Sequence, residues 1–179
     1  MDTDFEALYG ENKPVPPAPP LVYVAAPLPM WNAAREELNF LRSIGWSVSH
    51  DWTLDAEQFC KSGESIEHNF VLAESCVNGV AEADLVVAIL HSLMPTQGTW
   101  VELGVALALK KTIVVMLPES GQLSTIGIDT QHNSAEMQRF AAWRKRAIFL
   151  DHPGIARVTA STVDLFKVAE QVRKSKEAR

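Results

Sequence analysis

Short apolar runs alternate with longer amphipathic segments from Leu21 onward. The apolar or alternating runs predict strands at 21–26, 46–50, 85–90, 112–117 and 147–150. Apolar residues at helical spacing, with capping signals, predict helices at 32–43, at 64–78, through Glu102 after the loop 91–98, at 134–145 and at 162–174. Residues 51–62 and 118–133 fit neither pattern and are predicted to be loops.

Residues with capping preferences mark the ends of several of these helices. Asn32 and Ser134 are suited to begin a helix, because their side chains can accept a hydrogen bond from a free backbone N–H. Gly45 and Gly79 are suited to end one.

The strictly alternating order of strands and helices predicts a doubly wound α/β fold of the Rossmann or flavodoxin-like kind. Its five-stranded parallel sheet carries helices on both faces. Ligands bind such sheets at the carboxyl ends of the strands. Those ends are the predicted loops 25–32, 50–62, 91–99 and 118–133.

The 179-residue chain is predicted to hold one domain at 21–179, preceded by a proline-rich tail at 1–20. The prolines favour a polyproline II conformation, as a tail or a clamp over the domain. A partner-binding segment or a scaffold that uses this tail is the alternative.

The composition limits the kinds of partner and the cellular location that we expect for this protein. The net charge of -6 argues against a nucleic-acid polymer or an anionic membrane, but not against a nucleoside or nucleotide. The acidic N-terminus has no apolar run, Cys60 and Cys76 form no disulfide framework, and no apolar stretch is long enough to span a membrane. We therefore expect a cytoplasmic protein. The histidines and cysteines lack metal-ligand spacing and 25–29 lacks the glycines of a dinucleotide or ATP loop, so no metal or cofactor is expected.

Glu102 is the leading candidate for chemistry. It lies in Gly98-Thr99-Trp100-Val101-Glu102-Leu103-Gly104, where a loop is expected to open a helix. A carboxylate in the first turn is stabilised by the helix dipole, so we expect it to be ionised and able to act as a nucleophile. The structural alternative is a capping box, in which Thr99 and Glu102 each satisfy a free N–H.

Taken together, several segments resemble the nucleoside 2-deoxyribosyltransferase family, which includes related 2'-deoxynucleoside 5'-phosphate N-hydrolases. The similarity runs over roughly 21–172. The matching segments are Val22-Tyr23-Val24-Ala25-Ala26-Pro27-Leu28, Gly45-Trp46-Ser47-Val48-Ser49, Ala83-Asp84-Leu85-Val86-Val87-Ala88, the Glu102 motif with the following Lys-Thr-Ile-Val strand, and Ala147-Ile148-Phe149 with His152-Pro153-Gly154.

The resemblance implies cleavage of an N-glycosidic bond with Glu102 as the nucleophile that forms a glycosyl ester. It implies that Tyr23 orients this carboxylate by a hydrogen bond, although a core aromatic residue is the alternative. Asp84 matches a family aspartate that we expect to be structural, at the end of the sheet away from the site.

Two positions depart from the family. Cys76 stands where the family usually has an aspartate near the sugar or base, and Glu74, which points elsewhere on a helix, is a poor substitute. Thr96 stands where the transferases tend to have an aspartate that protonates the leaving base and the phosphate-preferring hydrolases a serine. Its hydroxyl can bind sugar or phosphate but is a weak general acid. Gln97 and Gly98 are expected to contact the substrate beside it, Gln97 at a base edge.

Other residues near the expected strand ends are candidates for binding. Trp31, Trp52 and Trp100 can stack on a base or pack in the core. His50 and Asp51 can touch the ligand or form a surface pair. Asn133, in the segment Gln131-His132-Asn133, can belong to a lid, reach a neighbouring subunit or be solvated. The basic run with Arg139, Arg144, Lys145 and Arg146 can attract a phosphate or form a solvated helix face.

The sequence therefore predicts cleavage or transfer at the N-glycosidic bond of a (2-deoxy)nucleoside or nucleotide. Glu102 and Tyr23 are the predicted catalytic residues, and Thr96, Gln97, Gly98, Trp52, Cys76 and Asn133 the predicted substrate-binding residues. The alternative is a catalytically reduced nucleotide-binding module of the same fold. A homodimer or a higher homo-oligomer is expected, as family sites are often completed across a dimer.

Overall fold

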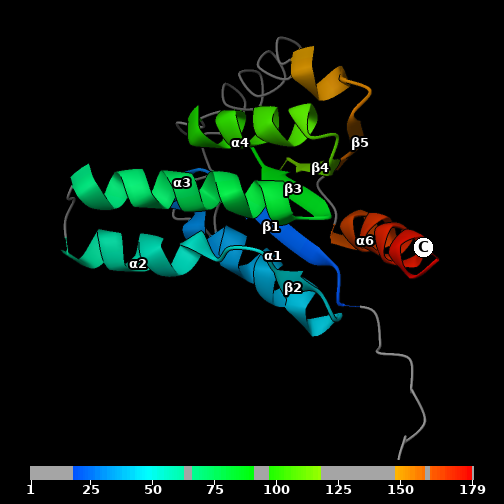
Figure 1. Cartoon of the computed structure of the whole chain (residues 1–179), viewed down its shortest axis with the longest axis horizontal. Coiled ribbons are helices and arrows are strands. Elements are labelled where there is room, and N and C mark those ends of the chain that lie inside the picture. Colours follow the sequence, from blue (N-terminus) through cyan, green and yellow to red (C-terminus); the bar gives the residue numbers. More distant parts are fainter. Residues whose placement is uncertain (1–17, 63–65, 91–96, 118–147, 160–161, 179) are drawn as a thin grey trace, which may run out of the picture.

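The computed structural model describes residues 18–62, 66–90, 97–117, 148–159 and 162–178. Its centre is a five-stranded sheet of order β2-β1-β3-β4-β5, in which all neighbouring strands are parallel. The strands are β1 (Leu21–Ala25), β2 (Ser47–Val48), β3 (Leu85–Ile89), β4 (Thr112–Met116) and β5 (Ile155–Thr159) (Figure 1). The predicted five-stranded parallel sheet is confirmed.

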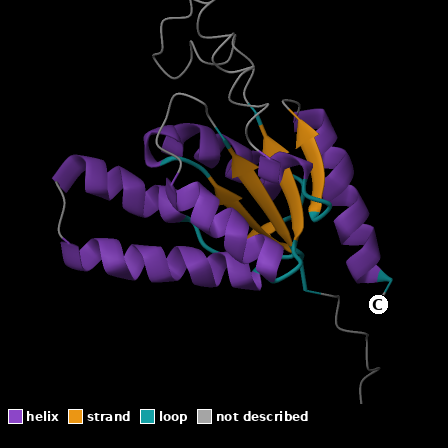
Figure 2. Cartoon of the chain, turned by 90° about the horizontal axis from the view of Figure 1, so that it is seen from above, coloured by secondary structure: helices purple, strands orange, loops and turns teal. Residues whose placement is uncertain are grey.

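Helices cover both faces of the sheet (Figure 2). They are α1 (Trp31–Ser43), α2 (Trp52–Ser62), α3 (Ile66–Glu82), α4 (Gln97–Ala108) and α6 (Thr162–Glu177), with short 3-10 turns η2 (Leu28–Met30) and η5 (Ile148–Asp151). Helices α3 and α4 pack against each other and against β1. Helices α1 and α6 approach each other where Thr162 Oγ1 lies 3.5 Å from Glu37 Oε1. Helix α2 lies beside α1 and α3.

The apolar runs form the core because both faces of the central strands are covered. Every residue of β3 is buried, as are the last four residues of β1 and of β4. A continuous apolar run is what a parallel strand packed on both faces requires. The sequence signal was strongest here, and the predicted strands at 21–26, 85–90 and 112–117 are confirmed to within a residue at each end.

The strand order places a topological switch point between β1 and β3. From β1 the chain first crosses to β2 on one side and later returns to β3 on the other. Connections that leave the two strands in opposite directions open a crevice at their carboxyl ends, where α/β proteins bind ligands.

The prediction that 51–62 is a loop was wrong, because this segment forms α2. Asp51 caps the helix: its Oδ1 accepts a hydrogen bond from Thr53 N at 3.2 Å. Arg35 on α1 then holds the helix in place, donating to Thr53 O at 2.7 Å and to Glu57 Oε2 at 2.9 Å. The polar residues of this segment lie on a helix that follows the edge strand β2. Asp51, as a helix-capping residue, was the sequence signal that could have predicted this helix.

The predicted strand at 147–150 was also wrong. Residues Ile148–Asp151 form the 3-10 turn η5, and the fifth strand is Ile155–Thr159. A turn in which Ile155 N donates to His152 O at 2.9 Å leads into this strand. The strand is at the sheet edge and two of its residues are exposed, so it lacks the apolar run that marks a central strand.

Of three predicted helix boundaries, two need correction and one is confirmed. Asn32 does not cap α1, because the helix begins one residue earlier and has no side-chain cap. Gly79 lies inside α3, which continues to Glu82. The predicted ending at Gly45 is confirmed, since this residue follows α1 with φ +91°, a conformation that glycine adopts readily. The helix predicted at 134–145, the loop at 118–133 and all of the proline-rich tail up to residue 17 lie outside the described residues.

Candidate functional site

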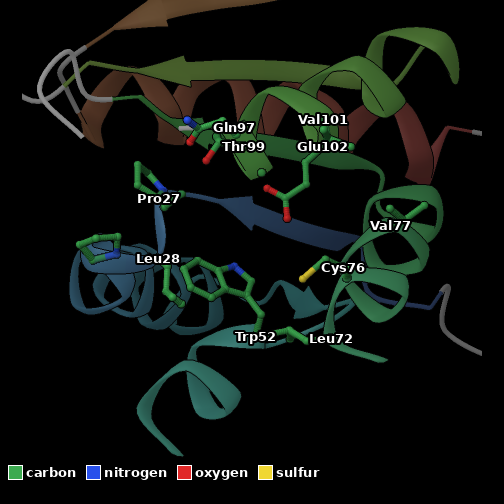
Figure 3. Close-up of a pocket in the computed structure, with 14 residues that line it drawn as sticks. Pro27, Leu28, Trp52, Leu72, Cys76, Val77, Gln97, Thr99, Val101 and Glu102 are labelled. Carbon is green, nitrogen blue, oxygen red and sulfur yellow. The ribbon is translucent and has the colours of Figure 1, made fainter. Parts of the chain in front are cut away.

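A cavity of about 610 Å³ opens at the switch point, between the loop after β1 and helices α3 and α4 (Figure 3). Pockets of this size accommodate small organic ligands. Most of the lining side chains are apolar. The lining residues are Ala26, Pro27, Leu28, Pro29, Trp52, Leu72, Ala73, Cys76, Val77, Gln97, Gly98, Thr99, Val101 and Glu102.

Glu102 is the acidic residue in this lining. Its Oε1 accepts a hydrogen bond from the Tyr23 hydroxyl at 2.5 Å. The first turn of α4 holds no acidic residue and Thr99 lies within the helix, so Glu102 is in the second turn. The predicted capping box is therefore wrong: the carboxylate pairs with a strand residue instead of folding back on its own helix.

Burial, rather than the helix dipole, dominates the electrostatics of Glu102. Desolvation raises the pKa of this carboxyl to about 7, although hydrogen bonds from Tyr23 and Cys76 act to lower it. The expectation that its position keeps it ionised throughout the neutral range is corrected: near pH 7 the protonated and ionised forms coexist.

The two neighbours of Glu102 remain protonated. Desolvation, reinforced by the charge of Glu102, holds the pKa of Tyr23 far above its usual value. Burial also raises the pKa of the Cys76 thiol to about 12, with the Glu102 charge adding to the effect. A phenol and a thiol that keep their protons are hydrogen-bond donors to the carboxylate, and neither adds negative charge to the cavity.

Tyr23 is positioned by close packing that the sequence did not indicate. It is fully buried on β1, and α3 crosses its ring at Gly79. A Cβ at Gly79 would lie 2.6 Å from His50 Cβ and 2.9 Å from Tyr23 Cδ2. Gly79 therefore allows α3 to approach β1 closely. It was wrongly assigned to a helix end because a glycine in the sequence also fits a helix C-terminus, and the close contact with Tyr23 shows only in the structure.

Trp52 completes the sheet edge as well as lining the cavity. Strand β2 pairs with β1 only at Leu21 and Val22, so the Val24 carbonyl lies beyond the ladder. The Trp52 Nε1 donates to this carbonyl at 2.7 Å, and the residue is 4% exposed. Trp52 is therefore both a buried core residue and part of the cavity lining.

Replacing Trp52 with Phe should lower the free energy of unfolding by about 1–3 kcal/mol, because the buried Val24 carbonyl loses its donor. Urea unfolding measures the change. Trp31→Phe is the control: Trp31 is half-buried, and its ring stacks on the Arg35 guanidinium at 4.6 Å. We expect that control to lose no more than about 1 kcal/mol. Equal losses in the two variants would contradict the role given to the Val24 hydrogen bond.

The other predicted binding residues divide into two groups. Cys76, Gln97 and Gly98 line the cavity, Cys76 from α3 and the other two from the beginning of α4. Thr96 and Asn133 lie outside the described residues, as does the basic run at 139–146. Glu74 is exposed and is not part of the lining, as expected.

Several other candidates have structural roles. Asp51 caps α2 and forms an ion pair with Arg42 at 2.6 Å, and His50 packs against Gly79 outside the cavity lining. Asp84 accepts from Leu21 N at 2.8 Å and from Lys176 Nζ at 2.5 Å, at the opposite end of the sheet, which agrees with its expected structural role.

The sequence analysis did not identify many of the residues that line the cavity. Residues 27–29 were noted only as a strand-end loop, and Leu72, Val77, Thr99 and Val101 were not identified. Their signal was ambiguous, because apolar residues on a helix normally predict core packing. Within the described ranges, no group of three or more His, Cys, Asp or Glu could hold a metal ion, and no helix is long and apolar enough to cross a membrane.

The fold and the site define an α/β protein whose cavity, with its buried carboxylate, lies at the carboxyl ends of β1 and β3, where proteins of this class bind small molecules. The family described as nucleoside 2-deoxyribosyltransferase matches residues 22–154, most of the chain. The chain belongs to this family. Its members are enzymes, and their chemistry is cleavage or transfer at the N-glycosidic bond of small nucleoside substrates.

Among solved structures, one similar chain is a CMP N-glycosidase of Clostridium botulinum. The two sequences are 21% identical, the match covers 60% of this chain and 80% of the other, and the TM-score is 0.36. No curated protein matches.

Proposed function

We propose that this protein cleaves or transfers at the N-glycosidic bond of a (2-deoxy)nucleoside or nucleotide, with Glu102 as the nucleophile. The observation that carries the proposal is the Glu102 carboxylate lining a cavity of about 610 Å³ while hydrogen-bonded to Tyr23. The family match supports the reaction class.

In the proposed reaction an oxygen of ionised Glu102 attacks the anomeric carbon of the sugar. A C–O bond forms, the C–N bond breaks, and its electron pair passes to the base nitrogen, which takes a proton from water. Water or a second base then attacks the glycosyl ester, which releases Glu102 as a carboxylate. The apolar lining holds the sugar in a poorly solvated site, where the charge of the carboxylate acts strongly on the oxocarbenium-like transition state.

Tyr23 acts here as a positioning residue. Its hydroxyl donates a hydrogen bond to Oε1, which fixes the orientation of the carboxylate in the cavity wall. Because a hydrogen bond to the charged form also lowers the pKa of Glu102, Tyr23 keeps more of the nucleophile ionised at neutral pH.

The test is a panel of deoxynucleosides and deoxynucleotides with free base as the readout. Turnover of at least one substrate, together with a covalent deoxyribosyl adduct on Glu102 after acid quenching, supports the proposal. Turnover without any adduct on Glu102, at a rate that Glu102→Ala leaves unchanged, contradicts it.

Tyr23→Phe should lower kcat about 10- to 100-fold and shift the pH profile. In the wild type, kcat/KM should rise with pH and level off above about 7, because the nucleophile must lose its proton. Without the tyrosine hydrogen bond the pKa of Glu102 rises, so the midpoint should move to higher pH. A variant with the wild-type midpoint would contradict the positioning role.

A nucleotide-binding module with reduced catalysis is the second candidate. It is favoured by Cys76, a neutral thiol beside Glu102 where the family usually has an aspartate. Saturable binding of a panel member without base release would favour this function. The homo-oligomer, the cytoplasmic location and the division of the chain at residue 20 stay predictions.

A further inference from the structure

Thr99 carries a buried hydroxyl that the proposed reaction has not used. The residue is 2% exposed, and its Oγ1 has no hydrogen-bond partner among the residues that the structure describes. A buried hydroxyl without a partner is unfavourable, so its retention at the wall of a cavity points to a partner that arrives with the ligand.

The place of Thr99 in the cavity defines which part of a ligand it can reach. Thr99 and Glu102 are three residues apart on α4 and therefore share a helix face. Figure 3 shows Glu102 between two ends of the cavity, with Gln97, Thr99 and Pro27 at one end and Cys76 and Val77 at the other. With the anomeric carbon at Glu102, a substituent pointing to the first end meets Thr99.

The walls at the Thr99 end suit a flat heterocycle. Pro27, Leu28 and Trp52 supply apolar surface, and Gln97 adds an amide that can both donate and accept. Apolar or aromatic surface around a flat ring, with a few polar groups at its edge, is the usual environment of a bound base. The sugar, by contrast, must remain at the Glu102 carboxylate for attack.

We propose that the Thr99 hydroxyl hydrogen-bonds the polar edge of the base that leaves. This inference rests on the proposed function for the orientation of the substrate. The hydroxyl donates to an acceptor atom of the base without transferring its proton, so it stabilises the electron density that gathers on the ring as the C–N bond breaks. Thr99 is then a residue that determines which bases are accepted.

The experiment compares wild type, Thr99→Val and Thr99→Ser in full-length protein. Valine keeps the shape and β-branching of threonine and removes only the hydroxyl, whereas serine keeps the hydroxyl. Affinities for free nucleobases and for free 2-deoxyribose are measured by NMR titration, and kcat/KM is measured for deoxynucleosides of the common bases.

We expect Thr99→Val to weaken binding of the preferred base about tenfold, to leave 2-deoxyribose binding unchanged, and to lower kcat/KM by a factor that differs from base to base. Thr99→Ser should restore most of each loss. Thermal unfolding separates a structural role: valine should leave the ligand-free protein equally or more stable, because it removes an unpaired buried hydroxyl.

A valine variant with wild-type affinity for every base overturns the proposal, as does a loss confined to 2-deoxyribose or a loss explained by lower stability. The binding measurements with free nucleobases do not require the protein to be catalytically active. A protein that binds bases through Thr99 but never releases base from a nucleoside would overturn the proposed function and leave only the assignment of Thr99 as a base-binding residue.

Discussion

Glu102→Gln should lower kcat/KM for base release by at least about 10³-fold, because the amide cannot attack the anomeric carbon. The amide oxygen can still accept the hydrogen bond that Tyr23 donates to Glu102 Oε1 at 2.5 Å. The fold and the cavity should therefore persist, and nucleoside binding should change far less than turnover. Steady-state kinetics and NMR titration with the same deoxynucleoside measure the two effects.

The same substitution should change how stability depends on pH. Burial raises the folded-state pKa of Glu102 from 4.5 to about 7, so the folded protein holds this proton more tightly than the unfolded chain does. The wild type should lose about 3 kcal/mol of stability as pH rises from about 4.5 to above 7. Glu102→Gln has no charge to bury and should lack this loss.

At about pH 8 the glutamine variant should thus be the more stable protein and the less active one. Urea unfolding across the pH range, with wild type and variant side by side, checks the sign. A variant that keeps rapid base release contradicts the role of Glu102 as nucleophile. Parallel stability curves would contradict its burial as an ionisable group.

Gly79→Ala should damage stability and turnover together. The new Cβ would lie 2.6 Å from His50 Cβ and 2.9 Å from Tyr23 Cδ2, so α3 must move away from β1 or the tyrosine ring must shift. Overpacking of this kind typically costs about 1–3 kcal/mol. Because the displaced ring carries the hydroxyl that holds Glu102, we expect kcat to fall about tenfold or more.

Gly104→Ala is the matched control. Gly104 is an exposed helical glycine with nothing within 4 Å of an added Cβ. Alanine there should be neutral or stabilise the protein by up to about 1 kcal/mol, since glycine is the poorer helix former. Urea unfolding and base-release kinetics on both variants test the comparison. If the two substitutions have the same effect, the contact at Gly79 does not position Tyr23.

The candidate site was only partly accessible from the sequence. Glu102 was identified from its place where a loop opens a helix, and Tyr23 was identified through the family resemblance. The structure joins the two side chains although they are 79 residues apart. The expectation that the helix dipole keeps Glu102 ionised in the first helical turn was wrong, because the residue lies in the second turn and burial raises the pKa of its carboxyl. Thr99 was interpreted as a cap, which its position inside α4 excludes.

The sequence by itself determined the central strands and the alternating order of strands and helices. The apolar runs in β1, β3 and β4 are local signals, because a parallel strand that is buried on both faces needs apolar residues at successive positions. The tertiary structure decided the strand order, and with it the switch point, as well as the edge elements and the chemistry of Glu102. Helix α2, the polar strand β5 and the pKa of the carboxyl depend on residues distant in the chain. Such contacts leave no periodic trace in the sequence.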